Sequence, residues 1–227
     1  MKIIGVTVGT PLSPSFIKEK LNPVQEKVID LEKAVADLQY VAIDIASFTN
    51  NVGTVETGST VNEVTLNWTL NKEPSNQTLN NEAVDVAVRS KKLTGLAIRA
   101  NETFTLAVED ERGATDSADT KVTFTNGVYH GVLESGAGID SAAILGLTRK
   151  LQNSKALTFT VNAGATQRIA YAIPTRLGTP NFNVGGFDGG FAKVNTLNFT
   201  NASGYTESYD VWMSENVGLG NTTVKAT

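Results

Sequence analysis

Four carboxylates near the C-terminal end of the chain have the side-chain type that acid–base catalysis uses: Asp188, Glu207, Asp210 and Glu215. A glycosidase needs only two such groups, but they must be held at a defined separation on either side of a sugar bond. No spacing in the sequence brings any two of these four to such a separation. We therefore expect no catalytic residue and interpret the chain as a protein without enzymatic activity.

Aromatic side chains gather in the same region and suggest a different chemistry. Exposed aromatic faces with Asp and Asn beside them suit the apolar faces and hydroxyl groups of sugars. The candidate glycan-binding residues are Phe187, Asp188, Phe191, Tyr205, Tyr209 and Trp212. The alternative is that Tyr209 and Trp212 are core residues on alternating strands, and the sequence leaves both interpretations open.

The chain offers few ligands for a metal ion or a cofactor. It has no cysteine and a single histidine, His130, which excludes thiolate sites and a two-histidine zinc site within one chain. The acidic residues Asp110, Glu111, Asp116 and Asp119 surround a Gly turn, but they lack the glycine and the final glutamate of an EF-hand loop. We interpret them as a solvated hairpin, and we expect no metal and no cofactor.

Composition and charge narrow the class of protein further. The 227 residues carry a net charge of −4, with a sequence pI of about 5.1, which argues against nucleic acid as a partner. No apolar run approaches the roughly 18 residues of a membrane-spanning helix. The first residues contain one lysine and no long apolar stretch, so we expect neither a signal peptide nor a membrane partner. Thr (28 residues) and Asn (20 residues) are abundant, which favours strands and turns.

A heptad pattern predicts a helix within residues 1–40. Residues 14–21 form a short helical segment, and a second segment begins at Pro23, which lacks the N–H needed to continue the first. Apolar residues follow at spacings of three and four, with charged Lys27 and Glu32 beside them, as in a parallel coiled coil. The predicted oligomerisation residues are Ile17, Leu21, Val24, Val28, Leu31, Val35 and Leu38. The alternative is an amphipathic helix that docks on its own domain.

Residues 41–125 show the pattern of short strands separated by turns. Apolar and polar residues alternate at 41–48 and 61–70, with Val64, Leu66, Trp68 and Leu70 on one face. Further strands are expected at 83–88, 93–98, 103–108 and 121–124. Six or seven strands at this spacing predict an immunoglobulin-like β-sandwich without a disulfide.

Residues 126–227 predict a second β domain with one short helix. Asp140 and Ser141 cap an expected helix that runs to Leu151, although Gly146 weakens it. Strands are expected at 156–161, 167–173, 181–184, 196–200 and 208–213, and the glycine-rich residues 185–191 are expected to form a loop. The predicted fold class is therefore mainly β: an N-terminal arm and heptad helix, an Ig-like sandwich, and a second β domain.

Several stretches of the chain carry a resemblance to a known family. The first is IGVTVGTP at residues 4–11, before the heptad helix. The others are IASFTNNVGTVE, TLNW, FTVNAG, VGGF and FTNASGYTE, at residues 45–56, 65–68, 159–164, 184–187 and 199–207. These stretches resemble accessory fibre and appendage proteins of tailed bacteriophages, and the first looks like the N-terminal virion anchor of such proteins.

The resemblance implies a non-enzymatic virion structural protein, a short fibre or decoration on the head, neck or collar, or tail. The resemblance also implies a homo-oligomer, with a trimer favoured. The heptad pattern itself has Val at position a and Leu at position d, a choice that favours a dimer. The arm would dock on another virion protein through Ile3, Ile4, Val6, Val8 and Pro11. We expect the protein in the virion, after synthesis in the bacterial cytoplasm. The alternative function is recognition of a host cell-surface glycan by the C-terminal domain.

Overall fold

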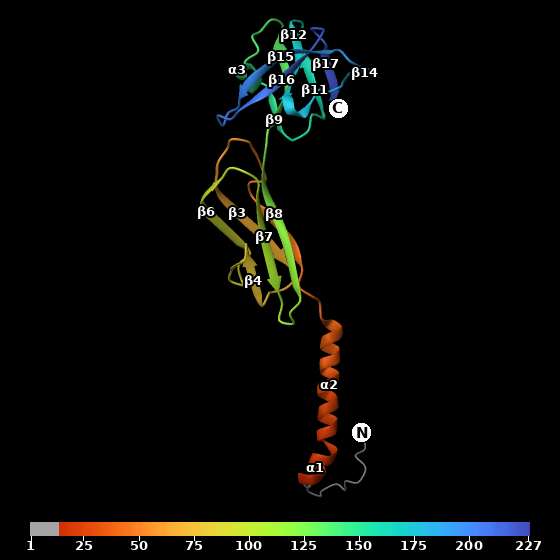
Figure 1. Ribbon diagram of the computed structural model, residues 1–227. Helices are drawn as coiled ribbons and strands as arrows, with labels where there is room; N and C mark the ends of the chain where they lie inside the picture. The colour runs from red at the N-terminus through yellow and green to blue at the C-terminus, as the bar shows by residue number, and fades with distance from the viewer. Residues whose placement is uncertain (1–13) are drawn as a thin grey trace.

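The computed structural model describes residues 14–227, apart from the side chains of Phe16, Ile17 and Lys20. Figure 1 shows an elongated molecule in which a helical stem, a β-sandwich and a second β domain follow one another in a line. Strands dominate the secondary structure, so the predicted mainly β fold class is confirmed. The predicted docking residues Ile3, Ile4, Val6, Val8 and Pro11 lie outside the described residues.

The stem consists of two helices that meet at Leu21. These are α1 (Pro14–Lys20) and α2 (Asn22–Gln39). The break falls where the sequence predicts it, because Pro23 lies in the first turn of α2 and has no N–H to donate back into α1. None of the residues of α2 is buried, so the helix does not bury its apolar face on the body of its own chain.

Two sheets form the sandwich that follows the stem. The first sheet has the order β1 (Ile45–Asn50), β3 (Val61–Leu70), β6 (Ser90–Ile98). The second has the order β2 (Thr54–Glu56), β8 (Thr115–Thr125), β7 (Glu102–Glu109), β4 (Asn76–Leu79), β5 (Glu82–Ala83). After β1 the chain changes sheets, and β2 pairs with β8 in parallel whereas the other pairings are antiparallel. This arrangement is an Ig-like β-sandwich, as predicted.

The core of the sandwich follows the alternation read from the sequence. Val64, Leu66 and Trp68 on β3 are all buried, and they pack with Leu106 and Val122 of the opposite sheet. The burial of alternate side chains places one face of β3 inside the sandwich. It also sets the register of the neighbouring strands, since a shift by one residue would turn these side chains to solvent.

One expected strand, residues 83–88, is mostly a loop. The buried side chain of Gln77 explains the difference. Its amide nitrogen donates to the backbone carbonyls of Asp85 and Val88, and its oxygen accepts a hydrogen bond from Trp68 Nε1 at 3.2 Å. These carbonyls are therefore bound by a side chain and not by a neighbouring strand.

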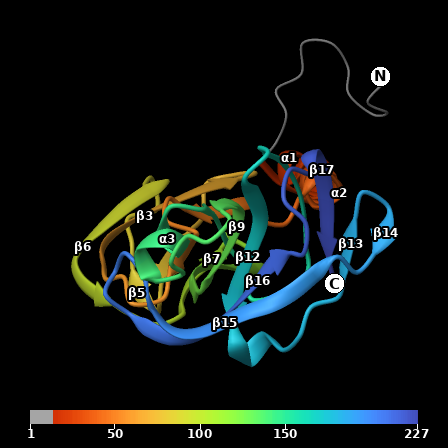
Figure 2. The ribbon, with the colours of Figure 1, turned by 90° about the horizontal axis from the view of Figure 1, so that it is seen from above.

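The second β domain also contains two sheets. One has the order β10 (Thr148–Leu151), β9 (Gly127–Glu134), β12 (Gln167–Pro174), β16 (Thr206–Ser214), β15 (Phe191–Thr200). The other has the order β11 (Leu157–Ala163), β17 (Gly220–Ala226), β13 (Phe182–Val184), β14 (Phe187–Asp188). Helix α3 (Ser141–Leu145) and the hairpin β13–β14 lie on opposite sides of β12 and β16 (Figure 2). A short 3₁₀ helix, Thr175–Leu177, follows β12.

Two predictions in this domain need correction. The helix that begins after Asp140 ends at Leu145, and residues 148–151 pair with β9 as a strand. The Asp140 cap is present, since its side chain accepts the N–H of Ala143 at 2.9 Å.

The glycine-rich run, residues 185–191, is mostly a tight hairpin and not a loop throughout. Gly185 and Gly186, with φ of 58° and 96°, make the turn between β13 and β14.

Candidate functional site

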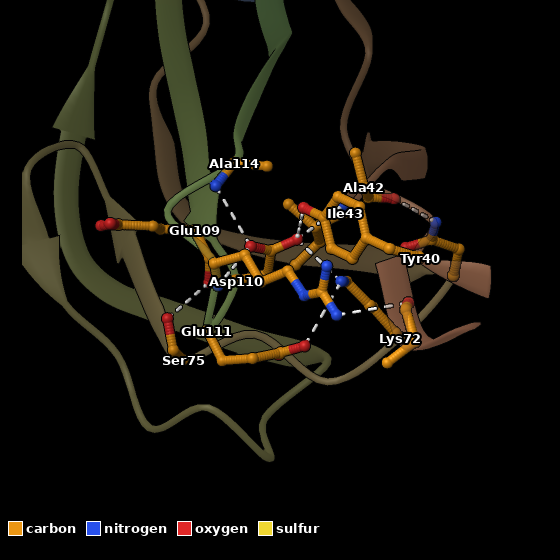
Figure 3. A network of polar contacts seen from close by, with 12 residues as sticks. Tyr40, Ala42, Ile43, Lys72, Ser75, Glu109, Asp110, Glu111 and Ala114 are labelled. Carbon is orange, nitrogen blue, oxygen red and sulfur yellow. Dashed lines mark hydrogen bonds and ion pairs between the residues drawn. The ribbon is translucent and has the colours of Figure 1, made fainter. Parts of the chain in front are cut away.

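A buried carboxylate, Asp110, joins the stem to the sandwich, in what we call the stem joint: Tyr40, Lys72, Asp110 and Arg112. Asp110 follows β7 and is only 2% exposed. Its Oδ2 accepts hydrogen bonds from the Tyr40 hydroxyl at 2.6 Å and from Lys72 Nζ at 2.7 Å. Figure 3 shows these side chains converging on Asp110 from three parts of the chain.

The second oxygen of Asp110 is also satisfied. It accepts the backbone N–H groups of Arg112 at 2.9 Å and Ala114 at 3.1 Å. Burial acts to raise the pKa of Asp110, but the hydrogen bonds from Lys72, Tyr40 and the two backbone groups outweigh it. The pKa therefore lies well below its usual range, and Asp110 is a structural anion. Its interpretation as part of a solvated hairpin is wrong.

Two cations lie over the ring of Tyr40, and this contact orients the stem. Lys72 Nζ lies 4.6 Å and the Arg112 guanidinium carbon 4.5 Å from the centre of its ring. Arg112 also reaches back to the last turn of α2, where it donates to Asp37 Oδ1 at 2.6 Å and to the Ala36 carbonyl at 3.3 Å. The end of α2 is thereby held against the sandwich.

The stem joint uses one face of α2 and leaves the apolar face free. With Val28 and Val35 at heptad position a, Ala36 and Asp37 fall at b and c, outside the a/d seam. The described seam residues are partly or fully exposed, from 43% for Leu21 to 86% for Leu38; they are Leu21, Val24, Val28, Leu31, Val35 and Leu38. The backbone of Ile17 lies in α1, but its side chain is outside the described part of the chain.

A second buried carboxylate joins the two β domains, in what we call the domain joint: Glu56, Tyr129 and Arg149. Glu56 is 4% exposed, at the end of β2. It accepts the Tyr129 hydroxyl at 2.8 Å and Arg149 Nη1 at 2.6 Å, both from the second domain. Only Asn126 separates β8 from β9, and this residue is itself buried. So short a connection, with an ion pair across it, restricts rotation between the domains.

Tyr205 also lies at this contact between domains, but it is 40% exposed, and its place in the predicted glycan site stays a prediction. A Cβ at Gly58 would lie 2.4 Å from the Cβ of Tyr205. In the same region Asn201 Nδ2 donates to the Thr57 carbonyl at 2.8 Å, and Ser59 and Ser203 share a hydrogen bond of 2.9 Å. Tyr205 therefore packs on the sandwich.

Tyr209 is wrongly placed in the predicted glycan site, because it is 2% exposed in the core. Its hydroxyl donates to the Gly127 carbonyl at 2.8 Å. Burial raises its pKa. The structure brings Asp188, Phe191 and Trp212 together in the lining of one hollow. Phe187 is 81% exposed on the hairpin beside this hollow and is not part of its lining.

Asp210 and Glu207, two of the four carboxylates considered for catalysis, are bound by neighbouring side chains. Asp210 accepts hydrogen bonds from Thr196 at 2.7 Å and Lys193 at 2.9 Å. Burial acts to raise its pKa, but these partners outweigh it and the pKa is lowered. A general acid needs the opposite shift. Glu207 accepts Arg176 Nε at 2.8 Å and an amide hydrogen of Asn126. Glu215 is exposed.

Residues 14–227 contain neither a cluster of metal-ligating side chains nor a long apolar helix. No group of three or more His, Asp or Glu side chains in this range is placed to hold a metal ion. Among the helices of this range, none is both long enough and apolar enough to cross a membrane. His130 lies between the two sheets with its ring 4.5 Å from that of Phe159, and its Nδ1 has no hydrogen-bond partner among the described residues.

Comparison with known proteins identifies no family. No protein-family model and no curated protein matches the chain. Among solved structures it is similar to chitinase ChiA74 from Bacillus thuringiensis, at 14% identity over 80% of this chain and 26% of that one, with a TM-score of 0.24. It is also similar to the N-terminal eight Ig domains of Down Syndrome Cell Adhesion Molecule isoform 1.30.30, at 10% identity over 76% and 23%, with a TM-score of 0.21. The chain spans about a quarter of each structure's length, and neither similarity assigns a function.

Proposed function

We propose that the chain is a non-enzymatic structural subunit of a bacteriophage virion, a short fibre or decoration on the head, neck or collar, or tail. One structural observation carries the association of several copies that this proposal requires. Helix α2 is clamped to the sandwich by its b and c positions, and its apolar a/d seam faces outward. A seam of this kind is stabilised when other helices cover it.

The partner of the seam is a further copy of this chain, aligned in parallel. A heptad seam is self-complementary, because the apolar residues of one helix fill the spaces between those of the next. Lys27 at position g and Glu32 at the following e position provide opposite charges across a parallel interface. We propose a trimer, with a dimer as the alternative that Val at a and Leu at d favour.

The two joints support an architectural role. Each joint fixes one end of the sandwich through a buried carboxylate, Asp110 towards the stem and Glu56 towards the second domain. A rod whose segments keep their relative orientation projects its far domain away from the assembly axis. Another virion protein is the proposed partner of residues 1–13, and the virion is the proposed location.

Light scattering on the full chain tests the association. We expect an oligomer at micromolar concentration, and we expect the double variant Val28→Lys/Leu31→Lys to be monomeric because it places charge in the seam. Ile29→Lys is the matched control, since Ile29 is 55% exposed but lies at position b. A monomeric wild-type chain, or equal effects of the seam and control variants, would contradict the proposal.

A second function, attachment to a host cell-surface glycan, is favoured by one observation. Three of the six residues predicted for glycan binding, Asp188, Phe191 and Trp212, lie together in a hollow of the second domain.

A further inference from the structure

We propose that this hollow, which we call the distal hollow, binds a neutral saccharide of one or two hexose units. The inference rests on the attachment function proposed above and is independent of association through the stem. The distal hollow has a volume of about 760 Å³, within the roughly 300–1,000 Å³ typical of ligand pockets. Residues of the hairpin β13–β14, of β17 and of the edge formed by β15 and β16 line it.

Two aromatic rings give the distal hollow an apolar wall. Phe191 and Trp212 line it and are only partly buried. The buried ring of Phe182 supports both, stacked on Phe191 with centroids 4.2 Å apart and tilted against Trp212 at 5.8 Å. Rings held in this way present a fixed surface to the C–H face of a sugar, at little cost in side-chain entropy.

Polar groups with free hydrogen-bonding capacity complete the lining. Asp188 accepts a hydrogen bond from Asn183 Nδ2 at 2.7 Å on one oxygen, which orients the carboxylate and leaves its other oxygen open. Lys225 is exposed, and its Nζ has no partner among the described residues. One acceptor and one donor of this kind match the hydroxyl groups of a sugar.

The charges in the lining favour a neutral ligand. Asp188 and Lys225 are the charged side chains of the distal hollow, and their charges cancel. The hollow therefore carries no net positive charge that would select a phosphate or an acidic sugar.

The position of the distal hollow suits attachment to a surface. It lies in the domain farthest from the stem (Figure 1), so association of stems leaves it uncovered. Copies held on one oligomer would also bind a repeating glycan together, which converts weak single contacts into stronger attachment.

A printed array of neutral oligosaccharides tests the inference. The array contains glucose, galactose, mannose, rhamnose and N-acetylglucosamine units, with sialylated and uronic-acid sugars as the charged comparison. We expect the labelled full chain to bind at least one neutral sugar, and we would measure that sugar's affinity by calorimetry. Absence of binding to every neutral sugar, or binding confined to the charged sugars, overturns the inference.

Variants of exposed lining residues locate the site without disturbing the core. We expect Asp188→Ala and Lys225→Ala each to weaken binding about tenfold or more. Phe187→Ala is the matched control, since Phe187 is exposed beside the distal hollow but outside its lining, and we expect it to bind as the wild type does. Trp212→Ala should abolish binding, with circular dichroism to check that it folds. Unchanged affinity in Asp188→Ala and Lys225→Ala overturns the assignment.

The same samples separate the two proposals. The Val28→Lys/Leu31→Lys variant should keep the wild-type affinity for a monovalent sugar in calorimetry. An oligomer that binds no neutral sugar contradicts the site alone, whereas a monomeric wild-type chain that binds sugar contradicts the association alone.

Discussion

Tyr40 and Tyr129 have equivalent roles at opposite ends of the sandwich. Each donates its hydroxyl hydrogen to a buried carboxylate, Tyr40 to Asp110 at 2.6 Å and Tyr129 to Glu56 at 2.8 Å. A basic side chain completes each arrangement, at 2.7 Å from Asp110 and 2.6 Å from Glu56. Both tyrosines lie outside the sandwich strands, so the same polar chemistry connects the sandwich to the stem and to the second domain.

Glu56→Ala should loosen the domain joint. The change leaves the buried Tyr129 hydroxyl without its acceptor and removes the partner of Arg149, whose side chain is 42% exposed. Because solvent screens that ion pair, we expect a loss of roughly 2 kcal/mol in the free energy of unfolding, measured by urea denaturation. The control is Glu63→Ala, which breaks an exposed pair with Lys92 and should cost less than about 0.5 kcal/mol. Equal losses would show that Glu56 has no special role.

Gly58→Ala should disturb the same region through the backbone. Gly58 has φ of 95°, and an added Cβ would lie 2.4 Å from the Cβ of Tyr205. We expect a loss of about 3 kcal/mol, from left-handed strain and the steric overlap together. Gly53→Ala is the control, because Gly53 has φ of 65° but nothing within 4 Å of the added atom; about 1 kcal/mol is expected there. The prediction fails if urea denaturation gives both variants the same stability.

Asp110 should make stability depend on acid pH. Its pKa is lowered from 3.8, so the folded state favours the ionised form. The resulting stability is present above about pH 3.8 and is lost as the pH falls from there towards the folded pKa. Asp110→Asn should lower the urea midpoint at pH 7 and flatten its decline in acid. Asp210 and Glu134, whose pKa values are also lowered, contribute to the decline that remains, as does His130. An acid decline as steep as that of the wild type would contradict this role.

His130 should produce a second pH dependence at higher pH. Burial, and to a smaller extent the charge of Lys150, lowers its pKa from 6.5. The folded state therefore favours neutral imidazole, so stability is complete above about pH 6.5 and falls as the pH drops below it towards the folded pKa. It is the only histidine in the chain, so one imidazole signal in an NMR titration reports its pKa. A value at or above 6.5 would contradict the buried position.

Local patterns in the sequence were sufficient to predict the main elements of the fold. The alternation at 64, 66 and 68 predicted the buried face of β3, because a strand places every second side chain on one side. Pro23 predicted the break in the stem, because it lacks an N–H.

Strands β9 and β17 were not predicted from the sequence. Their pairing depends on segments far along the chain, such as β11 with β17, and no local signal reports such a pairing.

The candidate sites show the same division. The glycan site predicted from the sequence contained three residues of the distal hollow, Asp188, Phe191 and Trp212, but Tyr209 is buried in the core. The joints were missed, since Glu56 reads locally as one polar residue near a turn and Asp110 as one of several acids around a glycine. The tyrosine partner of Glu56, Tyr129, lies 73 residues away along the chain, and that of Asp110, Tyr40, lies 70 residues away. Periodicity along the chain therefore determined which segments are helices and strands, whereas only tertiary packing decided which carboxylates are buried, because burial and ion pairing depend on residues brought together from distant parts of the sequence.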